Sequence, residues 1–222
     1  MNVLYQILTG RMDPTQIVAL LIALVIGISV HEFAHAAAAS WLGDPTPGQQ
    51  GRLTLSPAAH LDVMGSLMFL VGGFGWGKPV QYNPYALRAS PRAGPAIVSA
   101  AGPISNIILA VGVALIVRAL PLILDPFDLP AAIVSTIFYL LVFFIFYNLM
   151  LSVFNLIPIF PLDGFTILQG LLPPALADAL EATRQYGFFA LLILLFLGGG
   201  IVGTILYQPV FLLMRVLVGT GF

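Results

Sequence analysis

The sequence predicts an all-α polytopic membrane protein with about four to six transmembrane helices. Of its 222 residues, 59% are hydrophobic and 8% are charged, whereas about a quarter of the residues of an ordinary soluble protein are charged. Uncharged apolar stretches of about 20 residues, the length of a helix that crosses a bilayer, recur along the chain. Little sequence remains for a soluble domain, so we expect residues 1–222 to form a single membrane-embedded domain.

Charge and cysteine content exclude several other classes of protein. A formal net charge of −1 provides no basic surface for nucleic acid. The glycine-rich run 73–77 resembles a phosphate-binding loop only superficially, because no Lys-Ser or Lys-Thr pair follows it, so we expect no nucleotide. The chain has no cysteine, so any metal must be bound by histidine and carboxylate side chains.

The first predicted helix spans about residues 14–42. Residues 14–30 carry no charge, and the Gly-Asp-Pro sequence at 43–45 ends the helix. A removable signal peptide is the alternative, because Arg11 precedes the apolar run and small residues resembling a cleavage site follow it. Ionisable residues near the end of the run argue against this alternative, since they are costly at membrane depth and are usually functional.

A segment of about residues 45–92 is expected to combine β structure with a re-entrant stretch. It is rich in glycine and proline and holds four of the eight basic residues. The alternation of polar and apolar residues at 52–56 predicts a short strand, whose edge could pair with an unwound substrate segment. Residues 63–76 are apolar, but as a helix they would span about 21 Å against a hydrocarbon core of about 30 Å. We therefore expect this stretch to enter the membrane without crossing it.

Three further helices are predicted at about residues 93–120, 131–156 and 187–218, the last as one kinked helix or as two. In the second of the three, Asn148 and Ser152 lie on one face and are expected to form hydrogen bonds between helices. Small residues near the start of the first allow neighbouring helices to pack closely. They are Gly94, Ala96, Ser99, Ala100, Ala101 and Gly102.

His31, Glu32 and His35 form a His-Glu-x-x-His motif near the end of the first predicted helix. They include two of the three histidines and one of the two glutamates in the chain. Residues four apart lie on one face of a helix, so both imidazoles can meet one metal ion. Glu32 is then placed to act as the general base of a zinc hydrolase. The motif therefore predicts one zinc ion per chain, bound inside the membrane.

A catalytic zinc needs a third protein ligand and an open position for water. The candidates are His60, Asp62, Asp125, Asp128 and Asp163. Asp163 is favoured because two prolines break the apolar helix before it, and the following glycine allows unusual dihedrals, so the backbone can unwind and direct the carboxylate sideways. A helix end with a solvated carboxylate is the alternative. His60 is expected to form hydrogen bonds behind the ligands, because a fourth protein ligand would close the open position.

The topology provides an independent test of this choice. If His35 and Asp163 bind one metal ion, the chain between them must cross the membrane an even number of times. The helices at about 93–120 and 131–156 give two crossings, provided that residues 63–76 do not cross. More basic residues then lie on the side of the site than on the opposite side, which favours a cytoplasmic site. The first group is Arg52, Lys78, Arg88, Arg92 and Arg184, and the second is Arg11 and Arg118.

These motifs resemble those of the site-2 proteases, which are intramembrane zinc metalloproteases. The chain is most similar to the small bacterial branch of that family, without a PDZ or other regulatory domain. The resemblance rests on five stretches in the family's order, which are residues 31–35, 51–60, 75–80, 101–106 and 155–164.

The resemblance implies roles for particular residues. His31, His35 and Asp163 would be the metal ligands and Glu32 the catalytic residue. Asn155 would contact the substrate near the scissile bond, although capping of a helix end is the alternative. Asn106 is a further candidate for substrate binding or oxyanion stabilisation, with helix packing as the alternative.

The implied activity is hydrolysis of a peptide bond in or near a transmembrane segment of a membrane-protein substrate. The protein would lie in the lipid bilayer of a bacterial plasma membrane, and the sequence does not indicate its oligomeric state. Two other functions stay open, namely a metal transporter and a non-catalytic relative that binds membrane helices. A transporter should repeat polar sites along several helices, and a non-catalytic relative should lack part of the site.

Overall fold

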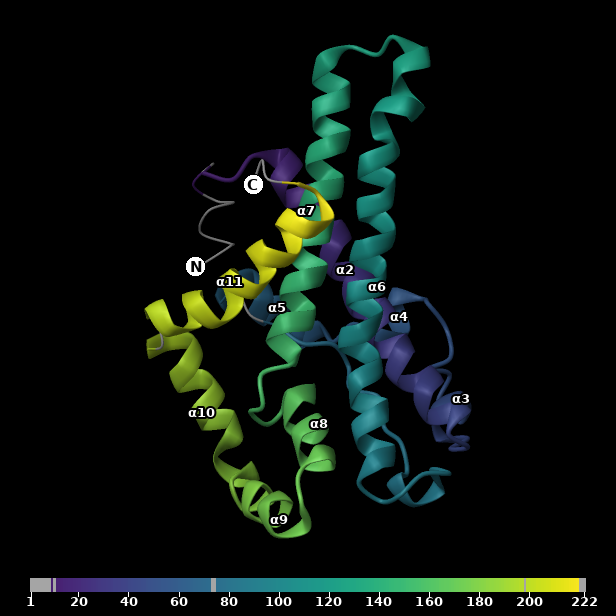
Figure 1. The fold of residues 1–222 in the computed structure, drawn as a ribbon, viewed down its shortest axis with the longest axis vertical. Helices are drawn as coiled ribbons and strands as arrows, with labels where there is room; N and C mark the ends of the chain where they lie inside the picture. Colours follow the sequence, from purple (N-terminus) through teal and green to yellow (C-terminus); the bar gives the residue numbers. More distant parts are fainter. Residues whose placement is uncertain (1–8, 10, 73–74, 198, 220–222) are drawn as a thin grey trace.

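The computed structural model describes residue 9 and residues 11–72, 75–197 and 199–219. Figure 1 shows a bundle of long helices flanked by shorter ones, so the predicted all-α class is confirmed. The helices of the described residues are α2 (Pro14–Trp41), α3 (Thr46–Gln49), α4 (Pro57–His60), α5 (Val63–Gly72), η1 (Pro84–Ala86), α6 (Ala93–Leu124), η2 (Asp125–Phe127), α7 (Ala131–Asn155), α8 (Asp163–Leu171), α9 (Pro174–Ala182), α10 (Arg184–Leu197) and α11 (Gly199–Leu217).

Three helices in the described part of the chain are long and apolar enough to cross a membrane: α2, α6 together with η2, and α7. A fourth span results if α9 and α10, which meet at an angle of 64°, are counted as one broken span. Three spans are fewer than the predicted four to six, and four spans equal the lower limit of that range. The expected helix at 187–218 is two helices, α10 and α11, which run in different directions from a sharp bend (Figure 1).

The first spanning helix begins and ends at strong local signals. Asp13 accepts a hydrogen bond from the Thr15 N–H at 2.7 Å, and the Gln16 side chain accepts one from the Asp13 N–H at 3.2 Å. Such a capping box satisfies backbone donors that a helix start leaves free. The chain leaves the helix through Gly43, whose φ of +104° favours a residue without a side chain.

Helices α2, α6 and α7 pack together through small residues and hydrogen bonds. A Cβ on Gly27 of α2 would lie 3.0 Å from Asn148 Oδ1 of α7, so this close approach depends on glycine. Asn148 accepts a hydrogen bond from Asn106 Nδ2 at 3.0 Å, and the Ser152 hydroxyl donates to the Pro103 carbonyl at 2.9 Å. The prediction that Asn148 and Ser152 join helices is confirmed.

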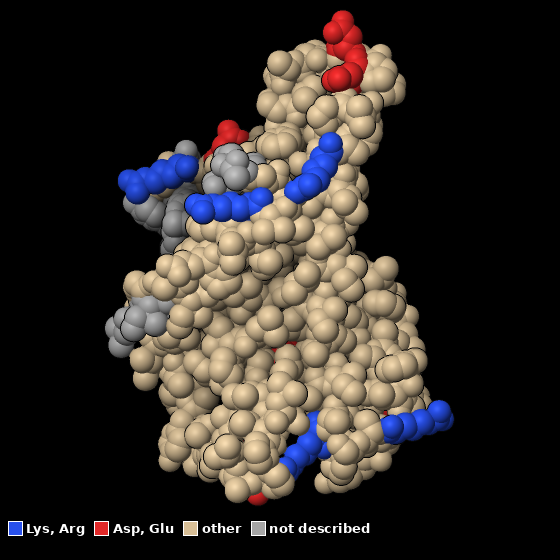
Figure 2. Space-filling view, viewed as in Figure 1, with Lys and Arg blue, Asp and Glu red and all other residues tan. Residues whose placement is uncertain are grey.

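Charged residues gather at the two ends of the bundle, and the band between them is almost uncharged on the face shown in Figure 2. At one end, the Arg118 guanidinium donates to the carbonyls of Val216 and Leu217, both at 2.7 Å, and so ties the last turn of α11 to α6. This distribution is expected of a protein whose middle faces hydrocarbon.

The predicted strand at residues 52–56 is wrong, because the described residues contain no strand and only one isolated bridge, between Leu61 and Gly77. In this segment, side chains form hydrogen bonds with backbone groups that would otherwise pair with a neighbouring strand. The His60 ring donates to the Thr54 carbonyl at 2.6 Å, and the Thr54 hydroxyl accepts from the Ser56 N–H at 3.1 Å. Local hydrogen bonds of this kind compete with a β ladder.

The stretch expected to be re-entrant leaves and returns at the same place. Helix α5 covers only ten residues, and Leu61 before it bridges to Gly77 after it. The Lys78 N–H also donates to the His60 carbonyl at 2.6 Å. The segment therefore does not add a crossing between α2 and α6. Residues 73 and 74 of the glycine-rich run lie outside the described residues.

Asp44 ties the end of α2 to the chain that leads into α6. It is 1% exposed, and it accepts hydrogen bonds from the Thr46 N–H at 3.0 Å, the Thr46 hydroxyl at 2.6 Å and the Asn83 N–H at 2.6 Å. Burial favours the neutral carboxyl, but the hydrogen bonds from Thr46 and Asn83 outweigh it and lower the pKa of Asp44.

Replacing Asp44 with asparagine should lower stability at pH 7 by about 2 kcal/mol, because hydrogen bonds to an ionised group are lost. A pKa that is lower in the folded state gives stability that is present above the unfolded pKa of about 4 and is lost as the pH falls below it. The difference in Tm between wild type and Asp44→Asn in detergent should therefore shrink between about pH 5 and pH 3. The exposed Asp178→Asn is the control, and a pH-independent difference for Asp44→Asn would contradict the prediction.

Candidate metal centre

The His-Glu-x-x-His motif lies in the second half of α2, on the face that packs against the rest of the bundle. His31 is 5% exposed and His35 is 8% exposed. Their rings lie edge to face with centroids 4.6 Å apart. Helical spacing alone accounts for this pairing, because residues four apart lie one turn apart on the same face.

Asp163 is the first residue of α8. Helix α7 ends at Asn155, and residues 156–162, which include Pro158 and Pro161, are non-helical. The chain therefore unwinds before Asp163, but the expected reason for the following glycine is wrong. Gly164 is helical, and a Cβ there would collide with the Leu156 carbonyl oxygen. This glycine is needed for space and not for its dihedrals.

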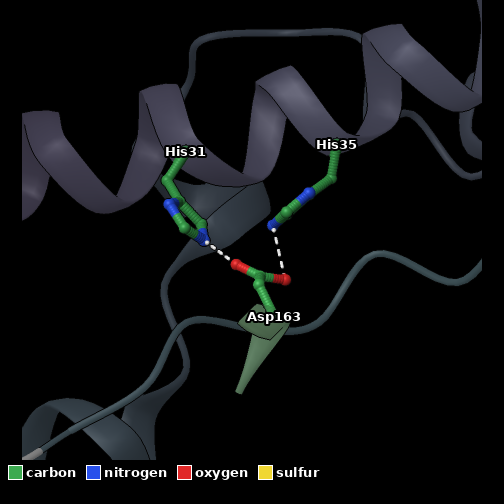
Figure 3. A group of neighbouring side chains, drawn as sticks. All are labelled: His31, His35 and Asp163. Atoms are coloured by element: carbon green, nitrogen blue, oxygen red, sulfur yellow. Dashed lines mark ion pairs between the residues drawn. The ribbon is translucent and has the colours of Figure 1, made fainter. Parts of the chain in front are cut away.

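The three predicted ligands lie together (Figure 3). Asp163 Oδ2 is 3.1 Å from His31 Nε2, and Asp163 Oδ1 is 3.4 Å from His35 Nε2. One ligand atom from each residue lies within 4.8 Å of the others. In the described part of the chain, one group of three or more histidine and acidic side chains is close enough to hold a metal ion, and it consists of these residues.

Hydrogen bonds behind the rings direct both Nε2 atoms toward Asp163. His31 Nδ1 lies 2.7 Å from Asn106 Oδ1, and His35 Nδ1 lies 2.7 Å from the Val98 carbonyl oxygen. The Asn106 amide nitrogen donates to the Gly27 carbonyl and to Asn148, each at 3.0 Å, so the Asn106 oxygen is the atom that faces His31. Both Nδ1 atoms must donate, and in the neutral rings each Nε2 carries a lone pair.

Two lone pairs therefore face a carboxylate, which is an arrangement of acceptors that needs a cation. Asp163 Oδ2 is buried, and it forms no hydrogen bond with the described residues despite its 3.1 Å distance from His31. Two imidazole nitrogens and a carboxylate oxygen are a ligand set that suits zinc. The residues present fit such an ion.

Helix α6 passes directly behind the histidines. A Cβ on Gly102 would lie 2.5 Å from His35 Nε2 and 2.6 Å from His31 Cε1, which is closer than side chains approach. The sequence identified Gly102 only as a small packing residue. Its contact with both histidines depends on how α6 crosses α2, which the spacing of small residues does not show.

The three candidate ligands and Glu32 line a cavity of about 370 Å³. Chain segments from α7, α10 and the return from the re-entrant stretch complete its walls. Residues that line it include Trp76, Gly77, Pro79, Val80, Tyr82, Leu151, Phe154, Asn155, Phe188 and Leu191. Residues 75–80 are one of the stretches that carry the family resemblance, but the sequence did not predict that they form a wall of this cavity.

The other predicted residues lie in different places. Asn155 lines the cavity, and its amide also donates to the Leu151 carbonyl at 2.9 Å. Asn106 does not fit a substrate contact, because it is 0% exposed and its amide is engaged with Gly27, His31 and Asn148. The His60 ring donates a hydrogen bond to the Thr54 carbonyl, and among the described residues it forms no hydrogen bond with the candidate ligands.

The three remaining acidic candidates for the third ligand lie away from the cluster. Asp62 accepts a hydrogen bond from the Gly65 N–H at 2.7 Å at the start of α5. Asp125 and Asp128 lie in the turn between α6 and α7, at the far end of the long hairpin. Chain topology thus separates these carboxylates from the histidines.

Comparisons with known proteins identify the family of this chain. Residues 122–198 match peptidase family M50. "Putative zinc metalloprotease YwhC" of Bacillus subtilis is 39% identical over 176 residues, which cover 79% of this chain and 78% of the relative. "Putative zinc metalloprotease Rip2" of Mycolicibacterium smegmatis is 32% identical over 193 residues, which cover 82% of this chain and 70% of the relative. No solved structure gave a significant match.

The helices long enough to span a membrane and these relatives show that the protein is an integral membrane zinc metalloprotease. The chain belongs to peptidase family M50, the site-2 protease family. Its enzymatic class and its zinc cofactor are therefore established, as the sequence predicted.

Replacing Gly102 with alanine should weaken zinc binding by about tenfold or more, because the new methyl group must displace both histidines. Zinc per chain, measured after dialysis against a graded chelator, is the readout. Gly112→Ala on the same helix is the matched control, since a Cβ there meets nothing within 4 Å. Equal zinc retention by the two variants would contradict the prediction.

Proposed function

We propose that this protein is an intramembrane endopeptidase in which His31, His35 and Asp163 bind one zinc ion and Glu32 is the general base. The observation that carries the proposal is the convergence of these four side chains on one cavity. A Glu next to the first of two histidines, with an acid as the third ligand, is a hydrolase arrangement.

Glu32 has the position that a general base needs. It follows His31 directly, lines the cavity with the candidate ligands and is 9% exposed. Zinc, when bound, supplies a Lewis acid that lowers the pKa of water to about 7. Glu32 takes a proton from the water that attacks the scissile carbonyl carbon, and it then delivers that proton to the amine released when the C–N bond breaks.

Asn155 and Asn106 have different parts in this proposal. The Asn155 amide has two N–H groups, of which one donates to Leu151 and the other can donate to the oxygen of the carbonyl under attack. One donor of this kind contributes about 3 kcal/mol in acyl-transfer enzymes. Asn106 instead holds His31 in the orientation and tautomer that leave Nε2 free for a metal.

Cleavage inside the membrane is supported by a second, apolar cavity. It has a volume of about 520 Å³ and extends between α2, α5, α7 and the α10–α11 pair. The residues that it shares with the cavity lined by Glu32 are Ile28, Gly75, Trp76, Leu151 and Phe154. An apolar groove that opens onto the reactive groups suits a membrane segment as substrate.

The two alternative functions have less support. A transport path should repeat polar sites along several helices, whereas the described residues contain one group of three candidate ligands. A non-catalytic relative should lack part of the site, yet both histidines, Glu32 and Asp163 are present and close together.

Glu32→Gln should reduce cleavage by about 100-fold or more, since it removes the base but leaves the three candidate ligands. Wild type and variant are purified in detergent and incubated with a panel of single-span model proteins, and each should hold about one zinc ion. Equal cleavage by the two would overturn the proposed base. Zinc flux into proteoliposomes that survives in the variant would favour the transporter.

We also propose that the site faces the cytoplasm. Arg215 lies in the last turn of α11, next to the residues that Arg118 binds, so it joins Arg11 and Arg118 at the end remote from the site. The comparison of basic residues therefore changes from five against two to five against three, in the same direction.

The absence of native cysteine allows a clean test of this orientation. Tyr85 is 92% exposed near the site, and Phe127 is 68% exposed in the turn between α6 and α7. A membrane-impermeant maleimide added to intact cells should label Phe127→Cys, whereas Tyr85→Cys should react only after the cells are permeabilised. The reverse pattern would place the site on the outer side.

A further inference from the structure

The chain that returns from the re-entrant stretch passes directly over Glu32. A Cβ on Gly77 would lie 2.9 Å from Glu32 Oε1, 2.8 Å from Ile28 Cγ2 and 3.1 Å from the His60 carbonyl oxygen. The backbone at Gly77 therefore fits between α2 and the chain before α5, with no room for a side chain. Six of the eight residues from 75 to 82 line the cavity, so the position of this backbone affects the shape of the wall beside Glu32.

Arg52 holds this backbone from the opposite side. The residue is 5% exposed, and its guanidinium donates to the carbonyls of Ala59, Lys78 and Pro79, the last two at 3.1 and 3.3 Å. A buried charge is costly unless hydrogen bonds compensate it. The rigid guanidinium can reach three carbonyls on two chain segments at once, which a lysine ammonium cannot do with the same geometry.

His60 completes this attachment. Its side chain is 0% exposed, and its ring Nε2 lies 2.6 Å from the Thr54 carbonyl oxygen, so Nε2 carries the proton and donates. Its backbone carbonyl accepts from the Lys78 N–H at 2.6 Å. His60 Nδ1 is buried and has no hydrogen-bond partner among the described residues. A buried ring with one unused nitrogen is expensive, so the single bond to Thr54 requires an explanation.

We propose that Arg52 and His60 are positioning residues of the protease, which fix the turn at 54–60 and thereby hold Gly77 against Glu32. Arg52 joins Ala59 to Lys78 and Pro79, and His60 joins Thr54 to Lys78, the neighbour of Gly77. Neither residue lines the cavity that contains Glu32 and the three candidate ligands. This inference rests on the role proposed for Glu32, and it adds a role for the otherwise unused His60 and Arg52.

Two matched pairs of variants separate positioning from general loss of structure. His60→Gln places an amide nitrogen where Nε2 lies and can keep the bond to Thr54, whereas His60→Asn places its nitrogen at the Nδ1 position and loses that bond. Arg52→Lys keeps the charge but not the three bonds. Arg88→Lys, at an exposed arginine of the same segment, is its control.

The probe is the single-span model protein that wild type cuts fastest, and rates are divided by the concentration of monodisperse, zinc-loaded enzyme. His60→Asn and Arg52→Lys should lower kcat by about 10- to 100-fold, with a smaller change in KM, because the base is misplaced while the apolar cavity is intact. His60→Gln and Arg88→Lys should stay close to wild type. Rescue by glutamine distinguishes a positioned hydrogen bond from loss of fold.

Amide hydrogen exchange provides a readout that does not depend on activity. Exchange in peptides covering residues 75–82 should be faster in His60→Asn than in wild type and unchanged in His60→Gln. If His60→Asn exchanges faster but keeps the wild-type kcat, the proposal is overturned and His60 has only a structural role. Equal losses of kcat in His60→Gln and His60→Asn would also overturn it. Full activity of Glu32→Gln would instead overturn the proposed function, and the exchange comparison would still test the attachment.

Discussion

The site depends on one constraint, which is that polar groups inside a membrane protein must find their partners within the protein. Asn106 meets this constraint for three helices at once. Its amide nitrogen donates to α2 and α7, and its oxygen accepts from His31. The same bonds that hold the helices together therefore set the orientation of a candidate metal ligand, so helix packing and metal binding cannot vary independently.

Close backbone approach is the second requirement, and glycine provides it at three positions around the cavity. Gly102 lets α6 pass behind both histidines, Gly164 lets the unwound chain fold against α8, and Gly77 lets the return segment lie on Glu32. These contacts come from separate parts of the chain. Together they place Glu32 and the candidate ligands around one cavity, which shares lining residues with a second, apolar cavity.

Residues 45–92 connect α2 to α6, and part of this segment lines the cavity beside Glu32. Several of their backbone groups are bound by side chains, namely those of Asp44, Arg52 and His60. This explains why the strand predicted at 52–56 is absent. Alternation of polar and apolar residues indicates a strand only when a neighbouring backbone is available to pair with it, and here side chains take that place.

Local sequence was sufficient for several features. The uncharged run before His31 and the capping residue Asp13 define α2, and the spacing of His31 and His35 puts two imidazoles on one face, because both features depend on residues within a few turns. Pro158 and Pro161 indicated that the chain unwinds before Asp163, and the even number of crossings between His35 and Asp163 was consistent with this choice of third ligand.

Only the tertiary structure decided which surfaces meet. Contacts between segments distant in sequence place Asn106 beside His31 and Gly77 beside Glu32. Such contacts also leave no space for a side chain at Gly102 and Gly164. By itself, the sequence determined which residue types are available as metal ligands and where they lie along the helices. The positions of these residues relative to one another follow from packing. The distance between two helices depends on all the side chains in their interface and not on the spacing of residues along one helix.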